Sequence, residues 1–471
     1  MPHNQEPMNL YTAVASTLLF PLHERLKGHD TAAILRALEK SQWLTPEQLK
    51  ALQLTRLQKL LEEVSTNVAY YRDLFPKLAL TAADFTCVEA LTALPPTDKT
   101  VIRNHLAAWQ AEGAHHLARH ATSGSTGEPL HFLLSKHRIS FDIAAKWRAT
   151  RWWGVDIGDR EMVLWGSPLE AAAQDRIRAL RDTLLRSRLV PARDLNAPRI
   201  DAILDEMRAF RPSMLFSYPS ALARVAFHAR EQGRRMDDLG IRVAFCTSEV
   251  LRPEWRQVIQ EVFGCGVANE YGARDAGFIA RECTHGGLHV TAEEVIVEVV
   301  DDVGHPVPAG VEGDILVTNL AGPEFPFIRY RTGDRGVLSG RQCSCGRGLP
   351  LIERISGRAN DGLVALDGSW VHGSAINHAL RELPGLKAYR IIQESRTLLR
   401  ILLVTGAPLH HDACSALTTH ARALLGNGLE VEIEQVMEIP PEPNGKFRHI
   451  ICRVERPEAA PQPSTTAQEA T

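Results

Sequence analysis

The chain has 471 residues, of which 44% are hydrophobic, and its 53 basic and 56 acidic side chains give a formal net charge of −3. Because the charges are balanced and form no long block of one sign, we expect no nucleic-acid partner. No apolar stretch approaches the length of a membrane span and the N-terminus lacks the pattern of a signal peptide, so we expect no membrane partner and a cytoplasmic location.

The N-terminal part is predicted to be helical. Apolar residues recur at helical spacing over residues 55–65, and Asp98, which follows two prolines, is expected to cap another helix. A short strand is predicted at residues 130–134, directly after a loop rich in hydroxyl groups and glycine.

That loop, residues 122–129, reads Thr-Ser-Gly-Ser-Thr-Gly-Glu-Pro and is predicted to bind phosphate. Glycine permits the positive backbone torsions that turn successive N–H groups to one side, and the hydroxyl groups add further donors. No Gly-Lys-Ser/Thr follows, so it is not a Walker-type loop. A turn that only connects two strands is the alternative. The expected binding residues are Thr122, Ser123, Gly124, Ser125, Thr126 and Gly127.

The middle of the chain alternates strand-like and helix-like segments. Strands are predicted at residues 162–165, 214–217 and 241–246, and helices at residues 220–231 and 253–263. This alternation predicts βα units on a largely parallel sheet, and therefore an α/β fold.

From about residue 289 to residue 334 the pattern becomes β-rich. Strands are predicted at residues 295–300, 314–318 and 327–330, separated by Gly, Pro and Asp turns. We assign this part, with the parallel sheets, to a large N-terminal domain of several subdomains that spans residues 1–357.

Residues 358–456 are predicted to form a small α+β domain, since about one hundred residues can fold alone. Strands are expected at residues 390–393, 399–404 and 429–433, with a helix at residues 412–425. The tail, residues 457–471, lacks periodicity and is expected to be disordered.

Residues 270–275 are predicted to place an aromatic ring and a carboxylate at a turn after a strand. Tyr271, followed by Gly272, can stack on a base, and Asp275 can hold Mg²⁺. The alternative is a tyrosine packed on a loop beside a surface ion pair.

Three more charged positions are candidate site residues. Asp334, after a predicted strand and a glycine, could accept hydrogen bonds from ribose hydroxyls or simply cap a turn. Arg358 is a cation at the predicted domain boundary, and Lys446 follows Asn-Gly on a tight turn. The alternative for Lys446 is a surface lysine that keeps a hairpin soluble.

The loop at residues 122–129 is followed along the chain by residues 270–275, Asp334, Arg358 and Lys446. In this order, these features resemble those of the adenylate-forming enzymes: acyl-CoA synthetases, luciferases and the adenylation domains of peptide synthetases. The similarity extends from about Arg56 to Cys452, and its nearest branch is the phenylacetate-CoA ligase-like group. Residues 67–75 and 247–249 add to the resemblance.

The resemblance implies two half-reactions. A large domain would hold ATP, Mg²⁺ and a small carboxylic acid, and a small mobile domain would bring in the catalytic Lys446 to bridge the acid and the α-phosphate. Residues 123–127 would hold the β- and γ-phosphates, Tyr271 the adenine and Asp334 the ribose, with Arg358 near ribose or phosphate. Coenzyme A would then take the acyl group. A homodimer is one option for the assembly.

The sequence departs from the family pattern in three places. Arg274 and Asp275 stand where most relatives have Thr or Ser and then Glu, which weakens the Mg²⁺ assignment. Asn360 occupies a hinge position that is commonly Asp. The phosphate loop ends in Glu128 and Pro129, without the lysine that many relatives carry.

Two short, glycine-flanked turns carry potential zinc ligands. Cys283, His285, Cys343 and Cys345 supply three thiolates and one imidazole, which is the ligand set of a structural tetrahedral zinc site. The alternative is a set of reduced cysteines on loops. Some members of the resembled branch have a similar arrangement.

The predicted function is therefore an AMP-forming acid–thiol ligase, with an aryl or arylacetic acid as the leading substrate. Aromatic and hydroxyl side chains near the predicted strands could line the acid pocket or belong to the core. They are Trp165, Ser167, Phe216, Tyr218 and Phe245. The alternatives are transfer of the acyl group to an amine, a hydroxyl or a carrier-protein thiol, and a nucleotide-binding protein without catalysis.

Overall fold

The computed structural model describes residues 9–122, 129–165, 181–192, 195–358, 362–372, 376, 380, 383, 385–406, 408–442 and 447–454. Several expectations therefore lie outside the described residues: those for Ser123, Gly124, Ser125, Thr126, Gly127, Ser167, Asn360, Lys446 and the tail. The described chain forms two compact units, one that runs from Asn9 to Gly357 and one that begins at Arg358.

The first unit begins with helices. They are α1 (Leu10–Val14), η1 (Ala15–Leu19), α2 (Phe20–Leu26), α3 (Thr31–Ser41), α4 (Pro46–Asn67), α5 (Ala69–Lys77), η2 (Ala82–Asp84), η3 (Val88–Ala93), α6 (Lys99–Asn104) and α7 (Leu106–Trp109). Thr45 and Gln48 form a capping box that starts α4, and the Asp98 carboxylate accepts hydrogen bonds from the N–H groups of Thr100 and Val101 to cap α6. The helix predicted at residues 55–65 and the Asp98 cap are both confirmed.

A sheet of eleven strands organises the rest of this unit. Its order is β10-β11-β12-β13-β9-β8-β7-β6-β5-β3-β4. The strands are β3 (Glu161–Trp165), β4 (Ser187–Pro191), β5 (Met214–Ser217), β6 (Val243–Thr247), β7 (Gly266–Ala273), β8 (Gly277–Glu282), β9 (Leu288–Val290), β10 (Val295–Val300), β11 (Glu312–Asn319), β12 (Tyr330–Ser339) and β13 (Leu351–Arg358).

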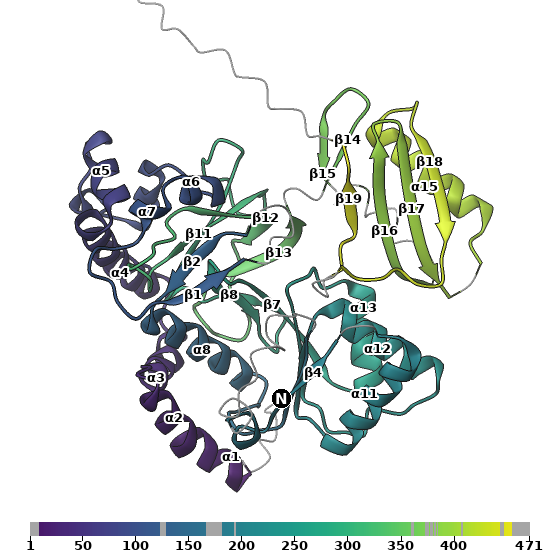
Figure 1. The fold of residues 1–471 in the computed structure, drawn as a ribbon, viewed down its shortest axis with the longest axis horizontal. Helices are drawn as coiled ribbons and strands as arrows, with labels where there is room; N and C mark the ends of the chain where they lie inside the picture. Colours follow the sequence, from purple (N-terminus) through teal and green to yellow (C-terminus); the bar gives the residue numbers. More distant parts are fainter. Residues whose placement is uncertain are drawn as a thin grey trace, which may run out of the picture. The chain divides into compact units, whose positions relative to one another are not determined.

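Strands β3 to β7 run parallel, whereas β7, β8 and β9 and the β10–β12 group pair antiparallel. The prediction of a parallel part followed by a β-rich part is thus confirmed. Helices α11 (Ala197–Phe210), α12 (Pro219–Glu231) and α13 (Pro253–Phe263) lie side by side (Figure 1). Their apolar residues and those of the parallel strands share one core, which includes Met207, Leu215, Val225 and Phe263. Burial of this apolar surface is the main stabilising contribution here.

A second core joins α4, the β-rich strands and the hairpin of β1 (Ala118–Ala121) and β2 (His131–Leu134). One prediction was wrong here, because β12 begins only at Tyr330 and residues 327–329 precede it without strand pairing. Phe327 and Ile328 are apolar because they enter the core from a loop, and Arg329 has a positive φ of 45°.

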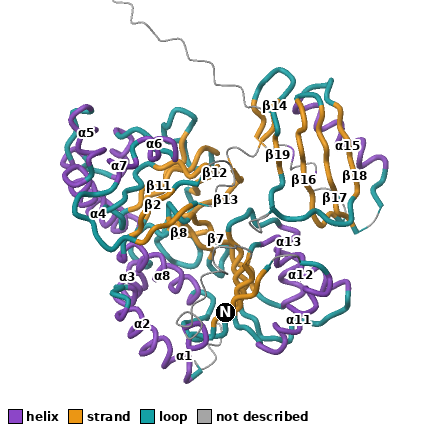
Figure 2. The backbone as a smooth tube through the Cα atoms, viewed as in Figure 1, coloured by secondary structure: helices purple, strands orange, loops and turns teal. Residues whose placement is uncertain are grey.

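The second unit has a sheet of order β18-β17-β16-β19, with α15 (His411–Leu425) beside β18 (Figure 2). Its strands are β16 (Leu386–Ser395), β17 (Leu398–Thr405), β18 (Glu430–Gln435) and β19 (Ile450–Cys452), and β14 (Gly362–Val364) pairs separately with β15 (Trp370–His372). The three predicted strands and the helix are confirmed. No helix in the described ranges combines the length and the apolar character needed to cross a membrane.

Candidate functional site

Two of the predicted motif residues lie together in the first unit. Tyr271 is buried on β7, and its hydroxyl donates a hydrogen bond to Asp334 Oδ2 on β12 at 3.0 Å. The same hydroxyl lies 3.2 Å from Thr332 Oγ1. Asp334 is half-buried, so its carboxylate is within reach of a ligand that packs against Tyr271. An aromatic ring beside a carboxylate suits a nucleoside, which offers a base to stack and hydroxyl groups to donate.

A bulge in β12 directs Asp334 to this position. Asp314 pairs with Arg335 and Leu316 pairs with Arg331, so one residue of β11 faces three residues of β12. Gly333, within the bulge, has a φ of 79°, which glycine adopts without strain. Asp334 therefore lies at a bulge inside a strand, and not at the capped turn that was the alternative interpretation.

Tyr271 likewise lies within a strand, and not on the turn that was expected. β7 continues to Ala273, and a register shift in the β7–β8 pairing follows Tyr271. A Cβ atom on Gly272 would lie 2.9 Å from the carbonyl oxygen of Gly277, so only glycine fits without a shift of the backbone there.

The position of Asp275 does not fit a magnesium ligand. Its side chain is only 4% exposed, Oδ1 accepts from the N–H of Ala276 at 3.0 Å, and Oδ2 accepts from the Tyr330 hydroxyl at 2.6 Å. Mg²⁺ usually keeps several waters, and such a hydrated ion needs an accessible carboxylate.

The ends of the predicted phosphate loop are held together. Thr122 donates its N–H to the carbonyl of Leu130 at 3.0 Å, and the N–H of Leu130 donates to Thr122 Oγ1 at 2.9 Å. Residues 123–128 thus connect two antiparallel strands, and Leu130 and Phe132 belong to the same core as Tyr271. The predicted strand after the loop is confirmed as β2.

Residues 247–249, at the end of β6, also lie next to β7. Thr247 pairs with Glu270 in the parallel register, and Ser248 has a positive φ of 70°. Glu249 Oε2 accepts from the N–H of Ser220 at the start of α12. The carboxyl ends of parallel strands are where α/β sheets bind ligands, which is consistent with a substrate at this edge.

Arg358 ends β13 and is the first residue of the second unit. Its predicted role near ribose or phosphate, like that of Lys446, remains a prediction.

Four potential metal ligands of the first unit gather in one cluster. The ligand atoms of Cys283, His289, Cys343 and Cys345 all lie within 4.8 Å of one another. Cys283 Sγ lies 3.7 Å from Cys343 Sγ, and Cys345 Sγ lies 3.2 Å from His289 Nε2. With Zn–S bonds of about 2.3 Å, two sulfur ligands of a tetrahedral zinc are about 3.8 Å apart, so the spacing fits.

The histidine of this cluster is His289 and not the predicted His285. Cys283 donates its N–H to Gly287 O at the β8–β9 turn, and the chain then returns so that His289 shares a face with Gly287. His285 Nδ1 instead lies 3.2 Å from Thr284 Oγ1. His289 Nδ1 can donate to Leu349 O at 3.3 Å, which leaves Nε2 facing the sulfur atoms. Burial lowers the pKa of His289 to about 4, so its imidazole is neutral at neutral pH.

Comparison with known proteins identifies the family of this chain. The AMP-binding enzyme family profile matches residues 12–321, which is more than half of the chain. The chain belongs to the family of AMP-binding enzymes. A second profile, the CapK C-terminal domain, matches residues 363–453.

This AMP-binding enzyme is similar to named relatives over most of its length. It is 28% identical to a phenylacetate-coenzyme A ligase of Thermus thermophilus over 351 residues, which cover 72% of this chain and 77% of the relative. It is 21% identical to Protein CapK of Staphylococcus aureus, with 86% and 89% covered. The fold is similar to that of a 2-hydroxyisobutyryl-CoA ligase in the postadenylation state, with a TM-score of 0.69 at 19% identity and coverage of 87% and 90%.

The aromatic residues considered for an acid pocket differ in their surroundings. Trp165 stacks on Tyr218 with ring centroids 4.2 Å apart, and Phe216 lies 5.8 Å from Trp165. Among the described residues, Trp165 Nε1 is buried without a hydrogen-bond partner. Phe245 is fully buried in a small core with Met214 and Val243, so it packs as a core residue.

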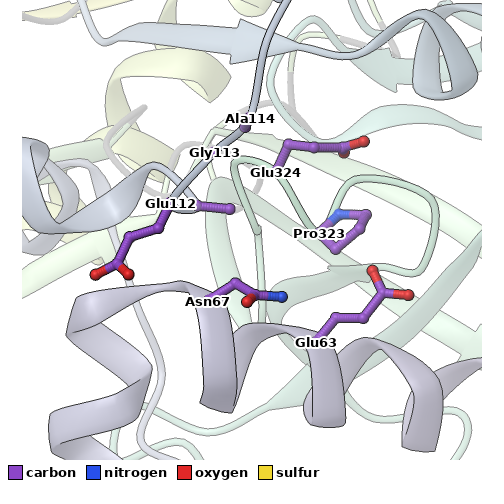
Figure 3. Close-up of a pocket in the computed structure, with 8 residues that line it drawn as sticks. Glu63, Asn67, Glu112, Gly113, Ala114, Pro323 and Glu324 are labelled. Carbon is purple, nitrogen blue, oxygen red and sulfur yellow. The ribbon is translucent and has the colours of Figure 1, made fainter.

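A separate pocket of the AMP-binding enzyme lies between the end of α4 and residues 111–114 and 323–324 (Figure 3). Its lining residues include Glu63, Glu324 and Asn67, and also Glu112, whose carboxylate pairs with Arg72 at 2.7 Å. The negative charges of Glu63 and Glu324 would repel an anionic acid, so this pocket does not suit the carboxylate substrate.

Proposed function

We propose that this AMP-binding enzyme activates a small carboxylic acid with ATP and transfers the acyl group to coenzyme A. The observation that carries the proposal is the hydrogen bond between Tyr271 and Asp334, which joins two sequence motifs beside the carboxyl ends of parallel strands. The similarity to phenylacetate-coenzyme A ligases supports an aryl or arylacetic acid as the substrate.

In the first step, a carboxylate oxygen of the acid attacks the α-phosphorus of ATP. The bond from this phosphorus to the bridging oxygen breaks, and pyrophosphate leaves with the electron pair. In the second step, the sulfur of coenzyme A attacks the acyl carbon, AMP leaves with the electron pair of the C–O bond, and the thiol proton goes to solvent.

The residues have distinct tasks in this proposal. Tyr271 packs against the adenine and Asp334 accepts hydrogen bonds from the ribose. The backbone and hydroxyl donors of residues 122–127 bind the phosphates, Arg358 adds positive charge, and Lys446 stabilises the charge that develops when one anion attacks another. The assignments of residues 123–127, Arg358 and Lys446 come from the sequence alone.

Pyrophosphate exchange with a panel of acids, with and without coenzyme A, tests the proposal. We expect exchange with at least one aryl acid, thioester formation when coenzyme A is present, and a large loss of exchange in Lys446→Ala. Lys77→Ala, which removes an exposed lysine of α5, is the control. Exchange that needs no acid, or that survives in Lys446→Ala, would contradict the first step. Exchange without thioester would favour another acceptor.

We also propose a structural zinc ion held by Cys283, His289, Cys343 and Cys345. The set has four ligands and leaves no position for substrate, as in closed structural sites. Gly287 supports the assignment, because a Cβ atom there would lie 2.7 Å from Cys343 Sγ. The four residues come from the β8–β9 hairpin and residues 343–345, so the ion would join two distant segments of the β-rich part.

A further inference from the structure

Tyr330 and Asp275 form a buried hydrogen-bonded pair that the proposed chemistry does not use. Tyr330 is fully buried at the start of β12, and Asp275 is 4% exposed. The 2.6 Å distance between the hydroxyl and Oδ2 is that of a charge-assisted hydrogen bond. Burial, together with the Asp275 charge, raises the pKa of Tyr330, so its hydroxyl keeps the proton and donates it.

Both oxygens of Asp275 already have protein donors. Oδ1 accepts from the N–H of Ala276, and this bond shapes the turn between β7 and β8. Oδ2 accepts from Tyr330. These two donors stabilise the negative charge of the buried carboxylate without a metal ion.

A second tyrosine–aspartate bond runs in the opposite direction. Tyr271 on β7 donates to Asp334 on β12, whereas Tyr330 on β12 donates to Asp275 after β7. In the sheet, β8, β9 and β13 separate these two strands. The two side-chain bonds therefore join segments whose strands are not direct hydrogen-bonded neighbours in the sheet.

We propose that Asp275 is a positioning residue that ligates no magnesium. Through Tyr330 it fixes the β7–β8 turn against β12, and it thereby sets the position of Tyr271 relative to Asp334 for a bound nucleotide. This inference deepens the proposed function and rests on it for the role of the nucleotide.

The test compares Asp275→Asn with Asp275→Ala and Tyr330→Phe. Asparagine can still accept from the N–H of Ala276 through Oδ1, and its amide can donate to the Tyr330 oxygen, so it keeps the geometry and removes the charge. Alanine leaves the Tyr330 hydroxyl buried without this partner, and phenylalanine leaves Asp275 Oδ2 without its donor.

Binding of AMP alone, without metal, is measured first by calorimetry. We expect Asp275→Ala and Tyr330→Phe to weaken it by about tenfold and Asp275→Asn to stay within about threefold of the parent. In pyrophosphate exchange, KM for ATP should rise in the first two variants more than kcat falls. The Mg²⁺ concentration for half-maximal exchange should stay unchanged in Asp275→Asn.

Two results would overturn the inference. One is a rise of about tenfold or more in the Mg²⁺ requirement of Asp275→Asn with unchanged AMP binding, as expected of a lost metal ligand. The other is unchanged AMP binding in both Asp275→Ala and Tyr330→Phe. AMP binding needs no acid. If the parent enzyme binds AMP but none of the tested acids supports pyrophosphate exchange, the proposed function is contradicted, whereas the comparison of AMP binding among the variants still tests this inference.

Discussion

Tyr271 and Asp334 are 63 positions apart in the chain, yet the tyrosine hydroxyl donates to the aspartate at 3.0 Å. The bond fixes the tyrosine ring and holds one carboxylate oxygen toward it. The ring and the carboxylate are therefore positioned before any nucleotide binds, which lowers the entropic cost of binding.

Tyr271→Phe keeps the ring and removes this hydrogen bond. We expect AMP affinity to fall by roughly twofold to tenfold, corresponding to about 0.5–1.5 kcal/mol, because Asp334 is then held less firmly. Calorimetry with AMP measures the change. Tyr11→Phe is the control, because it also removes one tyrosine hydroxyl. That hydroxyl belongs to the N-terminal helix α1 and donates a hydrogen bond to Leu184 O. Equal losses in both variants would contradict a specific role of Tyr271.

His289→Ala should abolish stoichiometric zinc in the purified protein, whereas His285→Ala should retain it. The reason is that His289 Nε2 lies 3.2 Å from Cys345 Sγ, while His285 Nδ1 contacts Thr284. Metal analysis of protein purified without chelator makes the comparison, and a lower Tm should accompany the loss of zinc. Loss of zinc in His285→Ala alone would restore the histidine predicted from the sequence.

Gly287→Ala places a methyl group 2.7 Å from Cys343 Sγ and should displace that ligand. We expect a loss of stability of about 1–3 kcal/mol together with weaker zinc retention. Gly340→Ala is the matched control, because its Cβ atom would make only an ordinary contact with Ala309 at 3.5 Å. Denaturant unfolding measures the stability of both variants. Similar losses of stability in the two would argue against a close contact between residue 287 and Cys343.

Arg329→Met should destabilise the fold by about 3–5 kcal/mol, because it leaves a charge buried without its partner. Arg329 is 2% exposed, pairs with Glu298 at 2.9 Å, and donates to the carbonyl oxygens of Leu94 and Gly304. Arg341→Met, at an exposed position, should change stability little.

The loss in Arg329→Met should also depend on pH. Burial already raises the pKa of Glu298, and Arg329 opposes this effect. Without Arg329, the folded-state pKa of Glu298 rises further above the unfolded value. The stability contributed by the protonated carboxyl is then present at low pH and lost as pH rises through the folded-state pKa. Unfolding is therefore measured for Arg329→Met and for the parent at pH 5 and at pH 8. The loss of unfolding free energy relative to the parent should be larger at pH 8, and a larger loss at pH 5 would contradict this account.

The regular elements could be predicted from sequence because each has its own local signal. Residues 214–217 form β5 and residues 253–263 form α13 as expected, since an apolar run predicts a buried parallel strand and apolar spacing predicts an amphipathic helix. The irregular positions carry no such signal. Tyr271 was predicted at a turn and Asp334 after a strand, whereas the structure places both inside strands. The bulges that keep them there depend on the partner strand.

The structure differs from the sequence-based expectation at two site positions, where the fold decides which groups meet. His285 is close to Cys283 in sequence, but the antiparallel return of β9 brings His289 to the cysteines. The two-residue alternation of a strand after the Gly-Gly turn was the signal that could have identified it. Asp275 was predicted at a turn as a magnesium ligand, and only the packing of Tyr330 reveals it as buried.

The bulge in β12 also limits how this chain can change. Successive strand residues point to opposite faces, so removal of Thr332 or Gly333 would leave β12 able to pair with β11 but would turn the Asp334 carboxylate away from Tyr271. A single-codon deletion here would spare the architecture and remove the proposed ribose acceptor. The length of this short segment is therefore constrained as strictly as the identity of the aspartate.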